Sequence, residues 1–214
     1  MIKKNKIAPI LIVVGVSVVV AGAPGVYAQL DANSKLTQSI AAGTINTNFT
    51  DASGATVSNP SFEMSSATVS TTGNMTTTGT YGSDTQRATV DKPGVAGGFT
   101  LALAAERPEI GWYATGNPTV SAYKHNGASA SEGQLTVGSG GTLGQYTGGS
   151  TGITGSVGGT FSGANNSITI MAGGAGMDSI WRGYVHGISL TQVIPSGTPA
   201  GSYSIDLVQT VTSV

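Results

Sequence analysis

The side chains that could carry out acid–base or metal chemistry are few in this sequence. Its 214 residues include two histidines, His125 and His186, and no cysteine. The lack of cysteine excludes a thiolate metal site, a cysteine nucleophile and a disulfide framework. Neither histidine lies in an HExxH pattern or in a close cluster of carboxylates, so we expect no zinc centre. A structural or solvated role explains both histidines more simply.

Glu106 and Glu109 are candidates for an acid–base pair, with Arg107 and Pro108 between them. A glycosidase needs two carboxylates that face each other across a sugar. A charged turn explains the same spacing equally well. We therefore predict that the protein is not an enzyme.

The nearest approach to a calcium loop is a run of oxygen-bearing side chains, Asn46, Asn48 and Asp51, that ends before Gly54. This run lacks the closing Glu and the density of carboxylates that an EF-hand loop has. Asn and Asp are also common in turns. We predict no cofactor, with calcium at this run as the alternative.

Aromatic side chains could instead line a groove that binds carbohydrate. The candidates for such a groove are Trp112, Tyr113, Tyr123, Tyr146, Trp181 and Tyr184. Packing in the core is the commoner use of aromatic residues. A carbohydrate-binding module therefore remains an alternative, with Trp112 and Trp181 as its possible ligand-stacking residues.

The elements that must position these residues are predicted to be β-strands. Apolar and polar residues alternate with a period of two in residues 203–211, which indicates a strand with one buried face. Further candidate strands cover residues 36–40, 56–57, 67–70, 74–80, 87–90, 99–104, 119–123, 134–137, 167–171 and 187–194. Many short strands separated by Gly, Asn, Asp and Pro predict a single antiparallel β-sandwich, Greek-key or immunoglobulin-like, over residues 29–214.

Residues 138–163 differ from the rest of the chain because they are rich in glycine. Gly-rich stretches commonly form flexible insertions, which in β-sandwiches often carry ligand contacts. We expect a partly ordered loop here, with a short strand at residues 157–161. A pair of Gly-rich edge strands around residues 151–161 is the alternative.

The first 28 residues have the order of a secretory signal peptide. Lysines at positions 3, 4 and 6 precede an apolar run at residues 7–20, and small residues then lead to Ala28. We predict export and cleavage after Ala28. The alternative is an uncleaved anchor over residues 7–27, since about 20 apolar residues span a bilayer. A membrane partner is expected only in that case.

The charge of the exported chain limits its partners. Without the three signal-peptide lysines, six of the nine basic residues remain against ten acidic ones, a net charge of −4. Nucleic-acid binding depends on neutralising phosphates, so no nucleic-acid partner is expected. The sequence favours a secreted or cell-surface protein.

Residues 29–40 follow the predicted cleavage site directly. They place Leu30, Ala32, Leu36 and Ile40 at even positions, with mostly polar residues between them. Such a segment is either the first strand of its own sandwich or a strand that completes the open edge of a neighbouring subunit, as in donor-strand filaments. The second interpretation predicts self-association.

Two strand regions resemble the WxL-type domain of bacterial cell-surface proteins. Residues 87–94 and 98–103 match its turn followed by a G-W-T-L strand, with Phe99-Thr100-Leu101 at the first W-x-L position. Residues 194–211 match its C-terminal end, with Gln209-Thr210-Val211 at the second W-x-L position. Both tryptophans that define the family are therefore replaced, by Phe99 and Gln209. The long spacing of the second match includes a closing-hairpin motif made of Pro195, Pro199, Ala200, Gly201 and Tyr203.

The resemblance implies a secreted β-sandwich that associates with the cell envelope without a covalent bond. Its implied partners are cell-wall polymer or other surface proteins, and its implied role is structural, adhesive or interactive.

Overall fold

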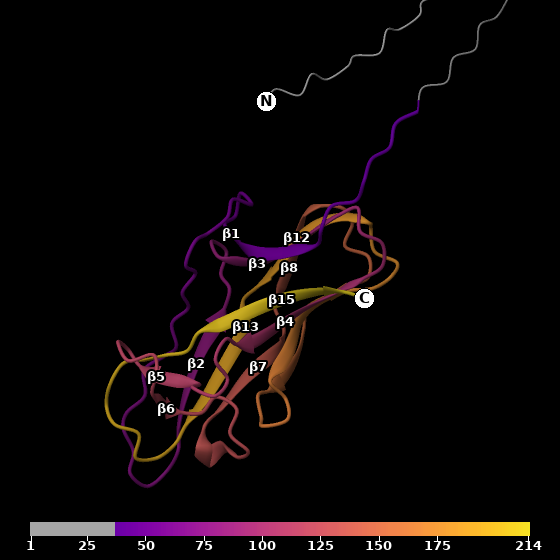
Figure 1. The fold of residues 1–214 in the computed structure, drawn as a ribbon. Coiled ribbons are helices and arrows are strands. Elements are labelled where there is room, and N and C mark those ends of the chain that lie inside the picture. The colour runs from indigo at the N-terminus through magenta and orange to yellow at the C-terminus, as the bar shows by residue number, and fades with distance from the viewer. Residues whose placement is uncertain (1–36) are drawn as a thin grey trace, which may run out of the picture. The chain divides into compact units, whose positions relative to one another are not determined.

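The computed structural model describes residues 37–214, of which Ile40–Val214 form a compact unit of their own (Figure 1). The predicted signal peptide, residues 1–28, and the segment up to residue 36 lie outside the described residues. Within residues 37–214, no helix is both long and apolar enough to cross a membrane.

The unit is an all-β antiparallel sandwich, as the sequence predicts. Its first layer contains two four-stranded sheets, and three strands of one sheet lie next in the chain to strands of the other. The strand order is β1 (Asn46–Thr50), β3 (Arg87–Pro93), β12 (Ile180–His186) and β8 (Thr142–Thr147) in one sheet. In the other sheet it is β10 (Ser156–Thr160), β7 (Gln134–Gly140), β13 (Ile188–Ile194) and β2 (Met75–Tyr81).

Glycine makes the bends that join these two sheets. Gly187 separates β12 from β13 with a φ of 71°, and Gly82 follows β2 with a φ of 77°. The backbone N–H of Gly187 donates to the carbonyl of Gly82 at 3.3 Å. A Cβ at Gly82 would lie 2.9 Å from the Cα of His186, so a side chain cannot be accommodated there. The layer therefore bends at one level across neighbouring strands.

The second layer and a small end sheet complete the fold. The second layer has the order β15 (Leu207–Ser213), β4 (Phe99–Ala105), β11 (Ser167–Gly173) and β9 (Ile153–Thr154). The end sheet has the order β14 (Tyr203–Ser204), β5 (Trp112–Ala114) and β6 (Ser121–Tyr123). A short 3-10 helix, η1 (Ala130–Glu132), precedes β7.

Alternation along the strands builds the core between the layers. Phe99, Leu101 and Leu103 of β4 are all fully buried, while the residues between them are half-buried. The ring of Phe99 stacks on Trp181 of β12 with 5.4 Å between the ring centroids. The side chain of Trp181 is only 2% exposed. This stack joins the two layers and excludes water between them.

The Gly-rich residues 138–163 form strands rather than the expected loop. The short strand predicted at residues 157–161 is present as β10. Together with β9 it matches the alternative of two Gly-rich edge strands around residues 151–161, whereas β8 was not predicted. Each of these three strands is the outermost of its sheet. Edge strands are held on one side only, so they tolerate glycine better than central strands.

The closing-hairpin motif does not form a hairpin. Strand β13, before it, pairs with β2 and β7, whereas β15, after it, pairs with β4 in the other layer. The Tyr203 hydroxyl donates to the carbonyl of Pro199 at 2.7 Å and closes the turn. Residues 195–206 therefore cross from one layer to the other.

Some predicted strands differ from those observed. Residues 37–40 and 67–70 are not strands, and the predicted strand at residues 203–211 is split into β14 and β15. The central strand β12 was not predicted, because Gly183 interrupts its alternation. A Cβ at Gly183 would lie 2.4 Å from the ring of Trp181 and 2.6 Å from the carbonyl oxygen of Gly144. The glycine is needed for packing there.

Replacement of Gly183 by alanine tests this packing constraint. We expect Gly183→Ala to lower the free energy of unfolding by about 1–3 kcal/mol, because the methyl group overlaps a backbone atom that cannot move cheaply. Urea unfolding followed by tryptophan fluorescence measures the change. The matched control is Gly73→Ala, since no atom lies within 4 Å of a Cβ at Gly73. Equal stability of the two variants would contradict the packing role.

Candidate functional site

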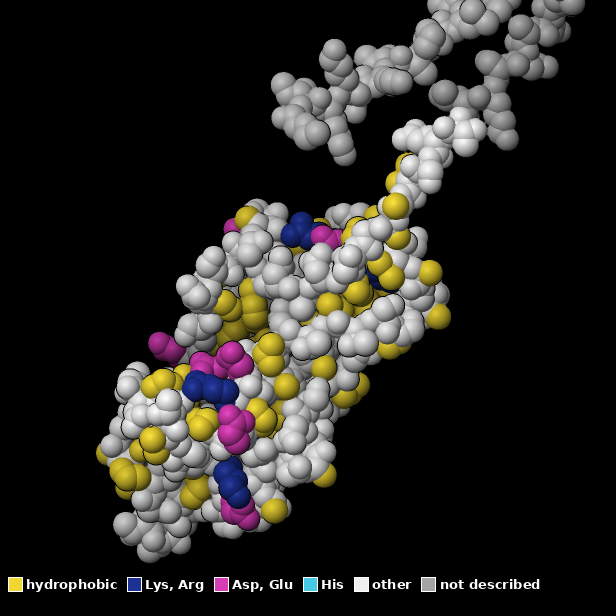
Figure 2. Space-filling model, viewed as in Figure 1, with side chains coloured by type: hydrophobic (Ala, Val, Ile, Leu, Met, Phe, Trp, Pro, Cys, Tyr) yellow, Lys and Arg dark blue, Asp and Glu magenta, His cyan; other side chains and the backbone are white. Residues whose placement is uncertain are grey.

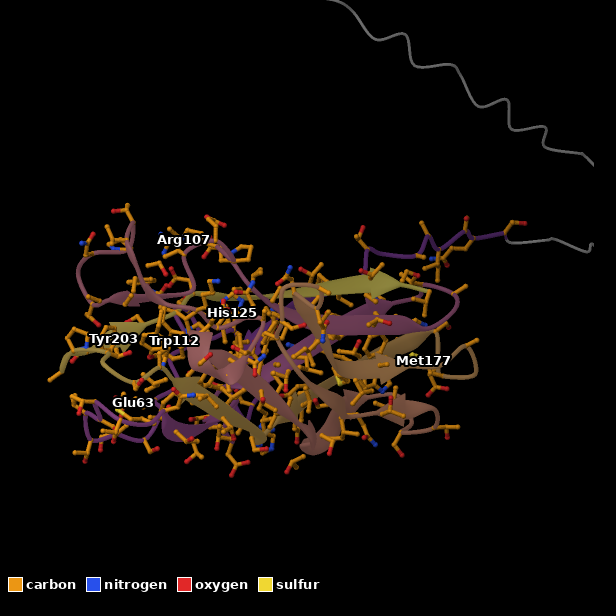
Figure 3. All side chains as sticks on the ribbon, turned by 90° about the horizontal axis from the view of Figure 1, so that it is seen from below. Glu63, Arg107, Trp112, His125, Met177 and Tyr203 are labelled. Atoms are coloured by element: carbon orange, nitrogen blue, oxygen red, sulfur yellow. The ribbon has the colours of Figure 1, made fainter. Side chains whose placement is uncertain are left out.

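A groove of about 870 Å³ opens at the end of the unit that carries β5 and β6. We call it the end groove. Figure 3 places Glu63, Trp112 and Tyr203 at this end and Met177 at the opposite end. One wall is the segment of residues 60–69 beside β2, and the other is residues 198–207. The floor comes from β2, β5, β6, β7 and β13 through Met75, Thr77, Trp112, Tyr123, Leu135, Leu190 and Ile194.

The first wall lies along the outer edge of β2 as an irregular, extended segment. The N–H of Ser65 donates to the carbonyl of Thr78 at 2.6 Å, and the N–H of Thr78 donates to the Ser65 hydroxyl at 2.9 Å. Met64 and Gly79 form an isolated bridge. A Cβ at Gly79 would lie 2.9 Å from the Glu63 carbonyl oxygen, so the wall can lie this close only because β2 has a glycine there.

A polar cluster fixes the second wall. The Tyr113 hydroxyl donates to Asp206 Oδ1 at 2.9 Å, and Arg107 forms a salt bridge with Asp206 Oδ2. The guanidinium of Arg107 also lies 5.2 Å from the centroid of the Tyr113 ring. Burial and the bond to Asp206 raise the pKa of Tyr113, so its hydroxyl keeps its proton at neutral pH. The charged turn predicted around residues 106–109 therefore braces β14 and β15.

The floor of the end groove contains aromatic rings, but these rings pack against one another and are largely buried. Trp112 stacks on Tyr123 at 5.7 Å, and Tyr203 meets Tyr123 edge-on at 5.3 Å. The Trp112 Nε1–H donates to Gln192 Oε1 at 2.8 Å. Trp112 and Tyr123 are only 8% and 7% exposed. Trp112 thus supports the groove, and its ring faces are not free for ligand stacking.

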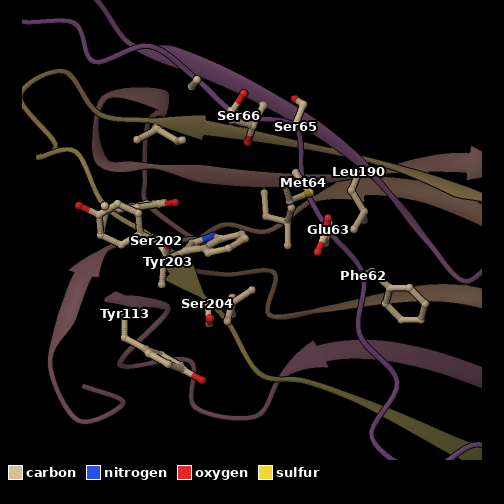
Figure 4. A pocket seen from close by; sticks show the side chains of 18 of the residues that line it. Phe62, Glu63, Met64, Ser65, Ser66, Tyr113, Leu190, Ser202, Tyr203 and Ser204 are labelled. Carbon is tan, nitrogen blue, oxygen red and sulfur yellow. The ribbon is translucent and has the colours of Figure 1, made fainter. Parts of the chain in front are cut away.

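The charges that line the end groove are all acidic. Glu63, Glu106 and Asp206 line it, and no Lys or Arg of the described chain does so. Arg107 pairs with Asp206, whereas no salt bridge within residues 37–214 involves Glu63 or Glu106. Figure 4 shows Glu63 and Met64 across the groove from Tyr113 and Tyr203. Charged side chains gather on one face over this end of the unit (Figure 2).

The six aromatic candidates are not brought together. Trp112, Tyr113 and Tyr123 line the end groove. Trp181 lies in the core against Phe99, which removes it as a stacking residue. Tyr146 and Tyr184 lie 5.2 Å apart in a separate cluster on β8 and β12.

That separate cluster fastens a turn to the first layer. Arg182 lies 5.1 Å from the ring centroid of Tyr146 and donates to the Gly54 carbonyl at 2.6 Å. The Tyr146 hydroxyl donates to the Asp51 carbonyl at 2.8 Å. Arg87 lies 4.2 Å from the ring centroid of Tyr184. These contacts hold both half-buried tyrosines in place and give the cluster a structural role.

The calcium alternative falls on a strand and a turn. Asn46 and Asn48 belong to β1, and the Asp51 carboxylate accepts hydrogen bonds from the Ser53 hydroxyl and from the N–H groups of Ser53 and Ala55. These bonds lower the pKa of Asp51. The Asp51 carboxylate thus accepts its hydrogen bonds from residues of its own turn. In the part of the chain that the structure describes, no three His, Asp or Glu residues gather as a metal site.

The two W-x-L-like positions lie on paired strands. Leu101 of β4 is opposite Val211 of β15, and Ala102 is opposite Thr210. Phe99 is fully buried, and Thr100 is half-buried beside it. The residues at both W-x-L-like positions therefore pair the strands of the second layer and pack against its core.

Gln209 forms a polar link between the layers at this edge. Its Nε2–H donates to Thr47 Oγ1 at 2.8 Å and to the Asn48 carbonyl at 3.0 Å. Its Oε1 accepts from the Tyr81 hydroxyl at 3.2 Å. Every polar atom of the amide has a partner, so a half-buried glutamine can replace an apolar residue here.

One motif was missed in the sequence. Ser150 lies in a Gly148-Gly149-Ser150-Thr151-Gly152 run, which has the GxSxG spacing of a hydrolase nucleophile. That nucleophile lies between a strand and a helix. Ser150 lies instead between strands β8 and β9, and no hydrogen bond within the described chain joins its hydroxyl to a histidine. The run is a turn with no catalytic geometry.

His125 lies fully buried just after β6, next to the groove floor. Its ring meets Phe161 edge-on at 5.4 Å, and neither ring nitrogen has a hydrogen-bond partner among residues 37–214. Its carbonyl accepts from the N–H of Leu135 at 2.7 Å. Burial lowers the pKa of His125, so the folded protein holds it neutral.

Acidification should therefore destabilise the fold through His125. The unfolded chain takes up a proton near the ordinary histidine pKa of about 6.5, whereas the folded chain does not. The stabilisation is present above pH 6.5 and is lost as the pH falls below it. We expect His125→Leu to reduce the slope of unfolding free energy against pH between about 7 and 5. Urea unfolding across this range measures it. Burial lowers the pKa of His186 as well, so the control is Gly73→Ala, which keeps both histidines. An unchanged slope in His125→Leu would contradict the assignment.

Comparisons with protein-family models, with curated proteins and with solved structures found no match to this chain.

Proposed function

We propose that this is a non-enzymatic, secreted or cell-surface β-sandwich protein that binds another macromolecule through its end groove. The observation that carries the proposal is the groove itself. It combines two extended walls, a largely apolar floor and two carboxylates, Glu63 and Glu106, that form no salt bridge within residues 37–214. The signal-like residues 1–28 and the acidic exported chain support the location outside the cell.

The walls favour an extended polypeptide as the ligand. Residues 60–69 use backbone groups on one side to follow β2, and β14 pairs with β5 on one side only. Extended peptides bind such edges through main-chain hydrogen bonds, and pockets for alternate side chains give specificity. The acidic lining selects for a ligand that carries Lys, Arg or a free amino group.

An envelope role follows from the WxL-like resemblance and is part of the proposal. Phe99 and Gln209 stand at the defining positions, and their contacts lie inside the unit. We assign these positions to the fold and envelope contact to the end groove. The partners proposed are cell-wall polymer or other surface proteins.

Cell fractionation tests the location. In the native host we expect the protein in the medium or in the cell-wall fraction, with Gln29 as its first residue after removal of the signal peptide. Immunoblotting and N-terminal sequencing give the result. A membrane-bound protein that keeps residues 1–28 would establish the uncleaved anchor. A full-length protein in the cytosol would contradict the proposal.

A charge placed in the groove tests the binding site. We expect Met64→Glu to lower retention of the purified protein on isolated host envelope about tenfold, because it adds an acidic group to an apolar contact. Co-sedimentation measures retention. The control is Val157→Glu, at a residue of β10 that is 66% exposed and does not line the groove. Circular dichroism verifies the fold of both variants, and equal retention of the two would show that binding lies elsewhere. Competition by soluble glucan or peptidoglycan fragments would favour the carbohydrate alternative.

A further inference from the structure

We propose that the ligand of the end groove is residues 29–40 of a second copy of this chain. This inference rests on the proposed function, because it names the partner of the same groove. Each copy would then donate its N-terminal segment to one neighbour and receive the segment of another. The product is a head-to-tail chain of subunits.

The groove offers apolar contacts on both walls to such a segment. Phe62 and Met64 are half-buried on the first wall, and Tyr203 and Leu207 are half-buried on the second. Residues 29–40 present Leu30, Ala32, Leu36 and Ile40 on one face of an extended chain. The apolar face of the segment can therefore meet these apolar residues while its polar face meets the polar lining or solvent.

The charge of residues 29–40 is also opposite to that of the end groove. The lining carboxylates Glu63 and Glu106 lack a salt-bridge partner within residues 37–214. Residues 29–40 contain one Lys and one Asp, and predicted cleavage after Ala28 adds a free amino group at Gln29. The cleaved segment therefore has a net charge of about +1 at neutral pH. Export and processing thus give the segment the sign that the groove attracts.

The attachment point of the segment lies far from the groove. The N–H of Gly43 donates to the carbonyl of Pro93, the last residue of β3, and Ile40 lies against Ile180, the first residue of β12. The groove is lined instead by Met75 at the start of β2 and by Ile194 at the end of β13. Ile40 is 86% exposed, so it is not yet packed in a core.

Length limits how the segment of a subunit could reach its own groove. From Ile180 to Ile194, β12 and β13 follow a path of about 45 Å at roughly 3.3 Å per residue, with the bend at Gly187 between them. Residues 29–39 can reach at most about 38 Å when fully extended. A segment that starts at Ile40 would therefore have to run almost fully extended along its own subunit to approach Met75 and Ile194. The groove of a neighbouring copy has no such limit.

The positions of donor and groove determine the form of the assembly. The end of the donor that the structure describes, at Ile40, and the groove lie on different surfaces of the unit, so the proposed contact is heterologous and is not closed by a two-fold axis. Repetition of a heterologous contact gives a ring or an open filament. The attachment point at Ile40 and the end groove lie near opposite ends of the unit, and this placement favours the open filament.

The test uses the chain that begins at Gln29, which keeps the whole of Ile40–Val214. We expect oligomers that grow with concentration in sedimentation velocity, and filaments in electron microscopy. Leu30→Asp/Leu36→Asp removes the apolar face of the donor, and Met64→Asp blocks the groove. Each variant alone should be monomeric, with self-association at least about tenfold weaker. A mixture of the two should form one-to-one dimers and no longer species, because only one groove and one donor remain intact.

Controls separate this inference from the proposed function and from misfolding. Val157→Asp should still form filaments. A synthetic peptide of residues 29–40 should shorten the wild-type filaments, a result that needs no variant to fold. A monomeric wild type, filaments that persist in the donor variant, or no effect of the peptide would each overturn the inference. If Met64→Glu still loses retention on the envelope in that event, the groove binds a different partner and the proposed function stands.

Discussion

The stack of Phe99 on Trp181 is the contact on which the two layers depend. The rings belong to different layers and lie 5.4 Å apart, and each has a glycine beside it. A Cβ at Gly173 would lie 2.7 Å from the Phe99 ring, and one at Gly183 would lie 2.4 Å from the Trp181 ring. The two glycines thus leave the space that the two rings fill. The close packing that results stabilises a core that contains no disulfide.

The sequence was sufficient for the fold class because alternation is a local property. Phe99, Leu101 and Leu103 show their buried face directly, and the matching strand β4 was predicted almost to its ends. Strand β12 was missed because the reason for Gly183 is not local. The glycine leaves room for the Trp181 ring of its own strand and for a carbonyl of β8, which only the folded protein brings together. In the Gly-rich stretch, β10 was predicted, β9 was expected only under the alternative of two edge strands, and β8 was missed for a similar reason. The glycines of this stretch meet neighbouring strands that lie close in space but not in sequence.

The end groove was less accessible to sequence analysis than the strands. Trp112, Tyr113 and Tyr123 were singled out as aromatic candidates, but residues 60–69 carry no regular alternation and were not recognised as a wall. Gln209 was conspicuous as a polar residue in an apolar position, yet its partners Thr47 and Tyr81 are more than a hundred residues away. Alternation within one strand says which face is buried. It does not say which distant polar group will satisfy an amide.

The course of β12 and β13 has a mechanical consequence. These strands run in succession from Ile180 to Ile194, and both are flanked by antiparallel neighbours along their length. Hydrogen bonds between antiparallel strands lie across the strand direction. Tension applied between the two ends of the unit therefore loads many of these bonds in shear at once, instead of peeling them apart one at a time. A unit built this way resists being pulled lengthwise far better than being opened from a sheet edge.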